Sequence, residues 1–143
     1  MNDEYYMKKA LQEAEEALKI GEVPIGAVIV CNDHIIAKSH NLTQHLTDVT
    51  AHAEMQAITS ASNTLGGKYL NECTLYVTIE PCVMCAGALC WSQIKRIVYG
   101  AKDPKKGYQL FSPNILHPKT ECIGGVMEKE CSQLVTAFFK KKR

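Results

Sequence analysis

The first part of the chain shows two patterns of apolar positions, which predict a helix followed by a hairpin. Apolar side chains recur every three or four positions in residues 3–20, as in an amphipathic helix, and Gly21 is suited to end it. Two apolar runs follow, residues 25–31 and 34–38, and the intervening Asn32-Asp33 pair is typical of a two-residue turn. We therefore expect two antiparallel strands after the first helix.

The middle of the chain predicts two further helices with a buried strand between them. Thr50 is a suitable N-cap, and apolar positions at helical spacing continue from there to Leu65. Residues 74–79 form an apolar run typical of a buried strand. Pro81 fits the first position of a following helix, which we expect to end near Ser92.

The last third predicts a strand over residues 94–99, a long loop over 100–118, a weak strand over 122–126 and a final helix. The apolar side of that helix consists of Cys131, Leu134, Val135 and Phe138. A strand, a helix and a second strand in this order form a crossover with parallel strands. Together with the hairpin, this predicts an α/β fold, a three-layer α/β/α sandwich around a mixed, mostly five-stranded sheet.

The length of the chain fits one domain covering residues 1–143 with a single good core. No apolar run approaches the length that a bilayer requires, and the N-terminus is polar and acidic rather than a signal peptide. We therefore expect no membrane association and a cytoplasmic location. The seven cysteines agree with a cytoplasmic location, because an odd number of cysteines without a secretory signal argues against a disulfide framework.

The net charge of +1 conceals an uneven distribution. Up to Ser92 there are five lysines and no arginine against eleven acidic residues, whereas from Gln93 onward eleven basic residues face four acidic ones. The two parts therefore carry about −6 and +7. A basic C-terminal third suits a polyanion such as nucleic acid, although a run of charges is more often only a solvated surface.

Four side chains near the predicted helix starts have the chemistry of a metal site: His52, Glu54, Cys82 and Cys85. One histidine and two cysteines suit tetrahedral Zn²⁺ with a fourth position left for water, which is the arrangement of a catalytic zinc. Glu54 remains as a carboxylate available for proton transfer. We expect one Zn²⁺ per chain, bound by His52, Cys82 and Cys85.

Each half of this motif has a simpler interpretation when taken alone. The Cys82 to Cys85 spacing also occurs in thioredoxin-like redox pairs, and a single histidine at a helix start is more often structural than a ligand. A redox pair, however, leaves His52 and Glu54 without a role. Together, His-x-Glu followed by Pro-Cys-x-x-Cys is the signature of the zinc nucleobase deaminases.

Over nearly its whole length the chain resembles the cytidine and deoxycytidylate deaminase superfamily, and within it the branch that deaminates adenosine in tRNA. The resemblance is carried by residues 5–7, 10–11, 22–28, 40–41, 50–54, 75–78, 80–88, 98–103 and 138–139. The run Pro-Cys-Val-Met-Cys-Ala-Gly-Ala and the later Gly-Ala-Lys-Asp favour the tRNA branch. Residues 107–112 depart from it, since they read Gly-Tyr-Gln-Leu-Phe-Ser where familiar members carry small residues.

The resemblance implies zinc-dependent hydrolytic deamination of adenosine to inosine at the wobble position of a tRNA anticodon loop. It assigns Glu54 as the proton shuttle that serves both the attacking water and the departing ammonia. It also implies that Asn41 and the backbone at Ala53 hold the nucleotide, with Asp103 at the substrate loop.

The resemblance implies a homodimer as well, since family members usually pair near the active site. An apolar interface on the exposed side of the ligand helices is expected from Met84, Leu89 and Trp91.

Two further functions use the same motif. A free-base or nucleoside deaminase acting on guanine or cytosine shares the zinc chemistry and differs in its pocket and surface. A non-catalytic RNA-binding partner subunit keeps the zinc to stabilise the fold, but such subunits typically lose the shuttle carboxylate, and Glu54 is present.

Overall fold

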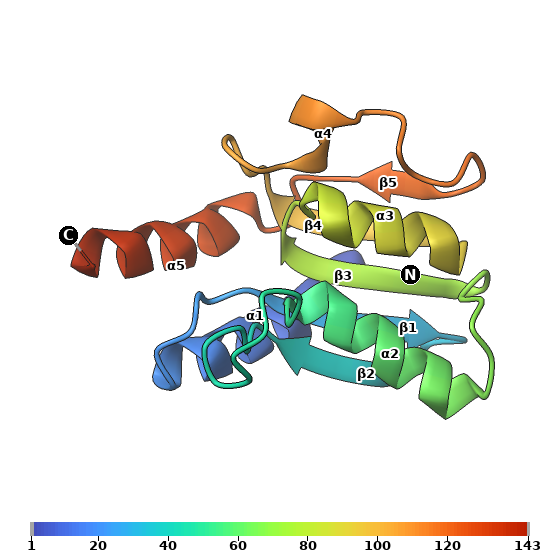
Figure 1. The fold of residues 1–143 in the computed structure, drawn as a ribbon, viewed down its shortest axis with the longest axis horizontal. Helices are drawn as coiled ribbons and strands as arrows, with labels where there is room; N and C mark the ends of the chain where they lie inside the picture. The colour runs from blue at the N-terminus through green and yellow to red at the C-terminus, as the bar shows by residue number, and fades with distance from the viewer. Residues whose placement is uncertain (1, 143) are drawn as a thin grey trace.

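The computed structural model describes residues 2–142, in which helices and strands alternate around one sheet (Figure 1). In chain order the elements are α1 (Asp3–Lys19), β1 (Gly26–Cys31), β2 (His34–His40), α2 (Ala53–Leu65), β3 (Cys73–Ile79), α3 (Val83–Ser92), β4 (Arg96–Ala101), α4 (Tyr108–Phe111), β5 (Glu121–Ile123) and α5 (Glu128–Lys141). Every predicted helix and strand is present, and the long loop additionally contains α4.

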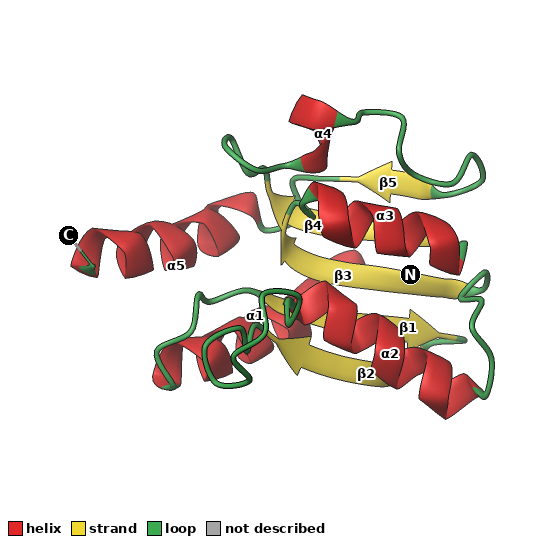
Figure 2. Ribbon diagram, viewed as in Figure 1, coloured by secondary structure: helices red, strands yellow, loops and turns green. Residues whose placement is uncertain are grey.

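The sheet has the strand order β2-β1-β3-β4-β5. β1 is antiparallel to both β2 and β3, whereas β3, β4 and β5 run parallel. Helices α2 and α3 cover one face, and α1 and α5 pack against the other, so the strands form a middle layer (Figure 2). The predicted α/β/α sandwich with a mixed five-stranded sheet is therefore confirmed.

The central strands are buried along their whole length because helices cover both faces of the sheet. All residues of β1 and β3 are buried, and each strand sends alternate side chains to opposite layers. One core lies between the sheet and α2 and α3, and the other lies between the sheet and α1 and α5. The ligand helices are thus fixed on a rigid platform.

The predicted hairpin is confirmed, and its turn explains the sequence at its tip. Asn32 and Asp33 have positive φ angles of 51° and 62°. Two successive left-handed residues are the requirement of a type I′ turn, and Asn and Asp tolerate that conformation better than most residues. The tight turn leaves β1 and β2 directly paired from Cys31 and His34 onward.

Both predicted helix starts were placed too early. Thr50 does not cap α2, because its backbone N–H and hydroxyl both donate to the Asp48 carboxylate, at 2.8 and 2.7 Å. His52 is the N-cap residue instead. Pro81 likewise precedes α3, whose N-cap is Cys82.

Several strand ends differ from the prediction by one to three residues. β1 begins at Gly26 rather than at residue 25, β2 extends to His40, β4 covers 96–101 rather than 94–99, and β5 covers 121–123 rather than 122–126. Pairing with a neighbour decides each end: β5 continues only as far as its parallel register with Arg96, Ile97 and Val98.

Three remaining points concern the basic C-terminus, the exposed side of α3 and membrane-spanning helices. The basic C-terminus includes Lys140, Lys141 and Lys142, which are exposed, whereas Arg143 lies outside the described residues. Leu89 was predicted to lie on an exposed apolar side of α3. This prediction is wrong, because Leu89 is fully buried in the core. No helix within residues 2–142 is long and apolar enough to cross a membrane.

Candidate active site

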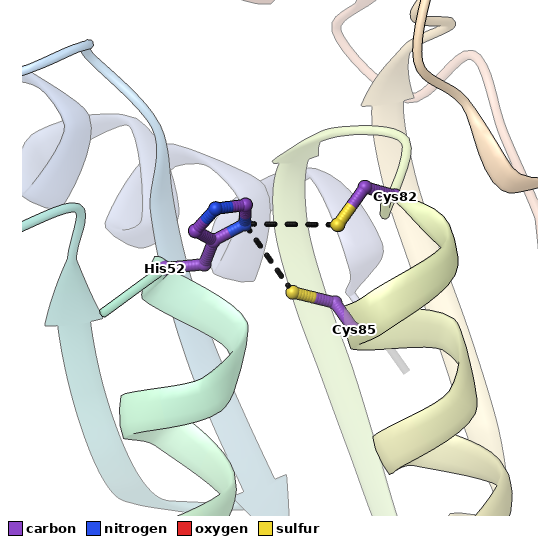
Figure 3. Close-up of side chains that lie close together, drawn as sticks. All are labelled: His52, Cys82 and Cys85. Atoms are coloured by element: carbon purple, nitrogen blue, oxygen red, sulfur yellow. Dashed lines mark hydrogen bonds between the residues drawn. The ribbon is translucent and has the colours of Figure 1, made fainter. Parts of the chain in front are cut away.

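His52, Cys82 and Cys85 come together at the adjacent N-terminal ends of α2 and α3 (Figure 3). The His52 Nδ1 atom lies 3.7 Å from the Cys82 sulfur and 3.5 Å from the Cys85 sulfur. One potential ligand atom from each residue lies within 4.8 Å of the others. Three side chains separated by up to 33 residues in sequence therefore converge on one point.

The start of each helix explains why these side chains face each other. His52 and Cys82 are both N-cap residues in extended conformation, with ψ angles of 155° and 174°. Neither residue makes a side-chain capping hydrogen bond, and both side chains turn toward the gap between α2 and α3 (Figure 3). Cys85 lies one turn into α3 and therefore on the same side as Cys82.

The two thiols have opposite acidities. Hydrogen bonds from Cys85 and His52, opposed by burial, lower the pKa of Cys82 to about 4. The shared hydrogen bond with Cys82 and burial raise the pKa of Cys85. The hydrogen bond to Cys82 also raises the pKa of His52, against the effect of burial. The low pKa of Cys82 favours a thiolate there, and the positive N-terminal ends of α2 and α3 stabilise this negative charge further.

The donor set fits a metal ion. Two sulfurs and one imidazole nitrogen form the ligand chemistry that Zn²⁺ prefers, and three protein ligands leave a position for water. Cys82 is partly exposed and lines an accessible pocket together with His52, whereas Cys85 is buried behind them.

Glu54 lies in the first turn of α2 and lines the same pocket, yet its side chain is only 4% exposed. Burial raises the pKa of Glu54 to about 7, and the negative charge on Cys82 acts in the same direction. A carboxyl group with a pKa near neutrality can both accept and return a proton under physiological conditions. Glu54 therefore has the position and acidity of a general acid and base.

The pocket has a volume of about 360 Å³. It is lined by Val23, Ile25, Asn41, Thr43, His52, Ala53, Glu54, Ile79, Glu80, Cys82, Asp103 and Lys106. The three residues expected to contact substrate, Asn41, Ala53 and Asp103, thus lie around the same cavity as the metal cluster. Cavities of this size with apolar walls and a few polar groups are typical of small-ligand and nucleotide sites.

Ala53 is held by β2, and Asn41 is held by the residue that precedes β1. The Ala53 carbonyl accepts a hydrogen bond of 2.7 Å from the Ser39 hydroxyl, which fixes the start of α2 against β2. The Asn41 backbone N–H donates to Ile25 at 3.1 Å. These contacts fix the positions of both residues at the rim of the pocket.

Two buried carboxylates outside the predicted metal and substrate residues also belong to this region, Glu22 and Glu80. Both accept hydrogen bonds from backbone N–H groups of loops bordering the pocket. Each glutamate stands beside a proline-containing corner, in Glu22-Val-Pro24 and Glu80-Pro81. For Glu80, the signal available in the sequence was an acidic residue directly after an apolar strand, whereas Glu22 lies in the connection between α1 and β1.

Comparisons with known proteins agree with this chemistry. The family model described as MafB19-like deaminase matches residues 1–143. The tRNA-specific adenosine deaminase of Bacillus subtilis (strain 168) is 47% identical over 99% of this chain and 91% of its own length. A similar protein of the same description from Aquifex aeolicus (strain VF5) is 46% identical over 100% of this chain and 97% of its own.

A solved structure from work on A-to-I editing by tRNA:A34 deaminases at the wobble position of transfer RNA has a TM-score of 0.84 to this chain. The two sequences are 42% identical, and the match covers 91% of this chain and 98% of the other.

Proposed function

The chain belongs to the deaminase family that includes the tRNA-specific adenosine deaminases, and from this we propose that it converts adenosine to inosine at the wobble position of a tRNA anticodon. One domain covering residues 1–143 would carry the activity. The observation that carries the proposal is the convergence of His52, Cys82 and Cys85 beside the buried Glu54. This arrangement combines a metal-binding cluster with a proton-transfer group in one pocket.

We propose that His52, Cys82 and Cys85 hold one Zn²⁺ ion per chain. When bound, Zn²⁺ supplies a water whose pKa falls from about 15.7 toward ~7, so that a nucleophile is available at neutral pH. The low pKa of Cys82 agrees with this role, because a cysteine must lose its proton to become a metal ligand.

Glu54 would move the protons that the reaction requires. Hydrolytic deamination adds water at C6 of adenine and releases ammonia, so one proton must reach a ring nitrogen and another the departing amino group. A single carboxyl group with a pKa near 7 can take the first proton of the attacking water and deliver it to the ring nitrogen. It can then take the proton of the new C6 hydroxyl group and pass it to the amino group, which leaves as ammonia. Burial keeps Glu54 out of bulk solvent during these steps.

Asn41, Ala53 and Asp103 are proposed as the groups that hold the nucleotide, since all three line the pocket. The Asn41 amide can donate and accept hydrogen bonds at a base or ribose edge. Lys106 extends the polar rim and carries a positive charge next to this cavity. A cation at the rim can contact the phosphates of a nucleotide within an RNA chain, whereas a neutral free base has no phosphate to contact.

An RNA substrate in the cytoplasm agrees with the basic character of the chain after Gln93. The anticodon loop is already single-stranded, so presenting its base costs less than extracting a base from a duplex.

We further propose a homodimer that pairs through the exposed end of α3 and the neighbouring α4. Trp91 is 85% exposed, and Leu110 and Phe111 of α4 are 58% and 62% exposed. Large apolar side chains at such exposure are typical of a protein–protein contact. Analytical ultracentrifugation of the wild type and Trp91→Ala tests this, with dissociation of the variant as the expected result.

Product analysis tests the proposed activity. The purified protein is incubated with a tRNA anticodon stem-loop containing a wobble adenosine and, in parallel, with free adenine, guanine and cytosine. Inosine in the RNA, with the free bases unchanged, is the expected outcome. Deamination of free guanine instead would support a second candidate, because a guanine deaminase structure from Bacillus subtilis is 42% identical with a TM-score of 0.68.

A further inference from the structure

The Glu80 carboxylate occupies a central position that the proposed reaction does not use. Glu80 lies between the end of β3 and Cys82, and it is only 5% exposed. Its side chain accepts hydrogen bonds from the Asp103 backbone N–H at 3.1 Å and from the Gln109 backbone N–H and side-chain amide at 3.3 and 3.1 Å. Both carboxylate oxygens therefore bind one loop, residues 103–109, at its two ends.

The backbone of this loop passes unusually close to Glu80. A Cβ atom placed on Gly107 would collide with the Glu80 carboxylate, so any larger residue at this position must displace that carboxylate. The next residue, Tyr108, donates its N–H to the Pro81 carbonyl at 2.9 Å, and Gly107 forms an isolated bridge with Cys82. The loop is thus attached directly to the corner that carries one of the proposed metal ligands.

The loop also carries two residues of the pocket rim, Asp103 and Lys106. The Asp103 carboxylate accepts the backbone N–H groups of Lys105 and Lys106, each at 3.0 Å, and so forms a compact turn. At the start of this turn, the Asp103 backbone N–H is bound by the buried Glu80 carboxylate. Moving the loop away from Glu80 would displace Asp103 and Lys106 together.

We propose that Glu80 is a positioning residue that fixes residues 103–109 against the Cys82 corner and thereby sets the substrate side of the pocket. A glutamine at this position has one acceptor oxygen and an NH₂ group that faces N–H donors, so it cannot satisfy all three contacts. Charge-assisted hydrogen bonds are also stronger than neutral ones. This proposal rests on the proposed function only where kinetics on tRNA are measured, because the digestion experiment does not require activity.

Limited trypsin digestion tests the loop independently of activity, because Lys102, Lys105 and Lys106 are exposed within or beside it. Wild type, Glu80→Gln and Gly107→Ala are digested under native conditions and the fragments are identified by mass spectrometry. Both variants should be cleaved faster at these lysines, whereas the matched charge change Glu15→Gln on the exposed side of α1 should not. Wild-type cleavage rates in Glu80→Gln would overturn the proposal.

Steady-state kinetics on the tRNA stem-loop then separate positioning from other roles. We expect Glu80→Gln to lower kcat/KM by about 10–100-fold, mainly through KM, with unchanged zinc content. A loss confined to kcat together with loss of zinc would show that Glu80 acts on the metal corner instead, which also overturns the proposal. If the wild type is inactive on tRNA, the proposed function fails, and the digestion result still decides the role of Glu80.

Discussion

The Glu22 carboxylate accepts two hydrogen bonds from His45, one from its backbone N–H at 2.8 Å and one from its ring nitrogen Nδ1 at 2.7 Å. The other carboxylate oxygen accepts the Gln44 backbone N–H at 3.2 Å and the Asn41 side-chain amide at 3.4 Å. One buried side chain therefore holds the loop that presents Asn41 to the pocket.

Glu22→Gln is expected to destabilise the protein by about 1–3 kcal/mol at pH 7, the typical cost of losing buried hydrogen bonds to a charged group. Burial alone would raise the pKa of Glu22, but the bonds from His45 and Gln44 outweigh it and lower the pKa below the ordinary value of 4.5. The stabilisation is therefore complete above pH 4.5 and is lost as the pH falls through the lower pKa of the folded state. Denaturant unfolding of both proteins at pH 7 and pH 3 measures this. A difference that does not shrink at pH 3 contradicts the charge-based explanation.

The purified protein is expected to carry one zinc ion per chain, and the Cys82→Ala, Cys85→Ala double variant is expected to carry none. Both sulfurs belong to the three-residue cluster, and removing them leaves a single imidazole. Elemental analysis measures the stoichiometry. Cys90→Ala in the same helix is the matched control and should retain the metal. Full zinc occupancy in the double variant would show that the ion binds elsewhere.

Glu54→Ala is expected to retain zinc and fold while losing at least the ~10²–10⁴-fold in rate that a general acid and base typically contributes. The carboxyl group lies in the pocket but is not part of the metal-binding cluster. Inosine formation and zinc content are measured on the same preparation, with the exposed Glu72→Ala as control. Normal activity in Glu54→Ala would exclude Glu54 as the proton shuttle.

Truncation after Phe139 is expected to weaken tRNA binding and to flatten its salt dependence. Lys140 and Lys141 form the last turn of α5, and Lys142 follows it, all three exposed. Each lost phosphate contact reduces the slope of log K against log salt by about 0.7 for single strands and about 0.9 for a duplex. Salt titrations of tRNA affinity for both proteins measure the slopes. Equal slopes would contradict RNA binding by this tail.

The sequence predicted the types of the helices and strands because apolar periodicity reports which side of each element is buried. It failed at element boundaries, where single contacts decide the outcome. Thr50 was expected to cap α2, but its hydroxyl is used by Asp48, a choice between two local hydrogen bonds that periodicity does not reveal. Pro81 is predicted at the first position of α3, but it precedes the helix, because Cys82 is extended and forms a bridge with Gly107.

In the site, too, local sequence patterns predicted some residues, whereas residues that depend on tertiary contacts were not predicted. The types and spacing of His52, Cys82 and Cys85 suggested a metal cluster, since few other functions require this combination. Glu22 and Glu80 were not assigned roles, because a glutamate contacting loops 22 to 29 residues away leaves no local pattern. Their roles depend on tertiary contacts that only the assembled sheet brings together.

The strand order also fixes when the cluster can form during folding. β1 meets β2 across a two-residue turn, whereas its pairing with β3, which joins Ala27 to Val77, closes a much longer segment of chain. Long closures cost more chain entropy and form more slowly than local hairpins. His52 lies within this segment, while Cys82 and Cys85 follow β3. The two thiols therefore become neighbours as soon as α3 forms. The imidazole of His52 joins them only when β1 pairs with β3 at the centre of the sheet.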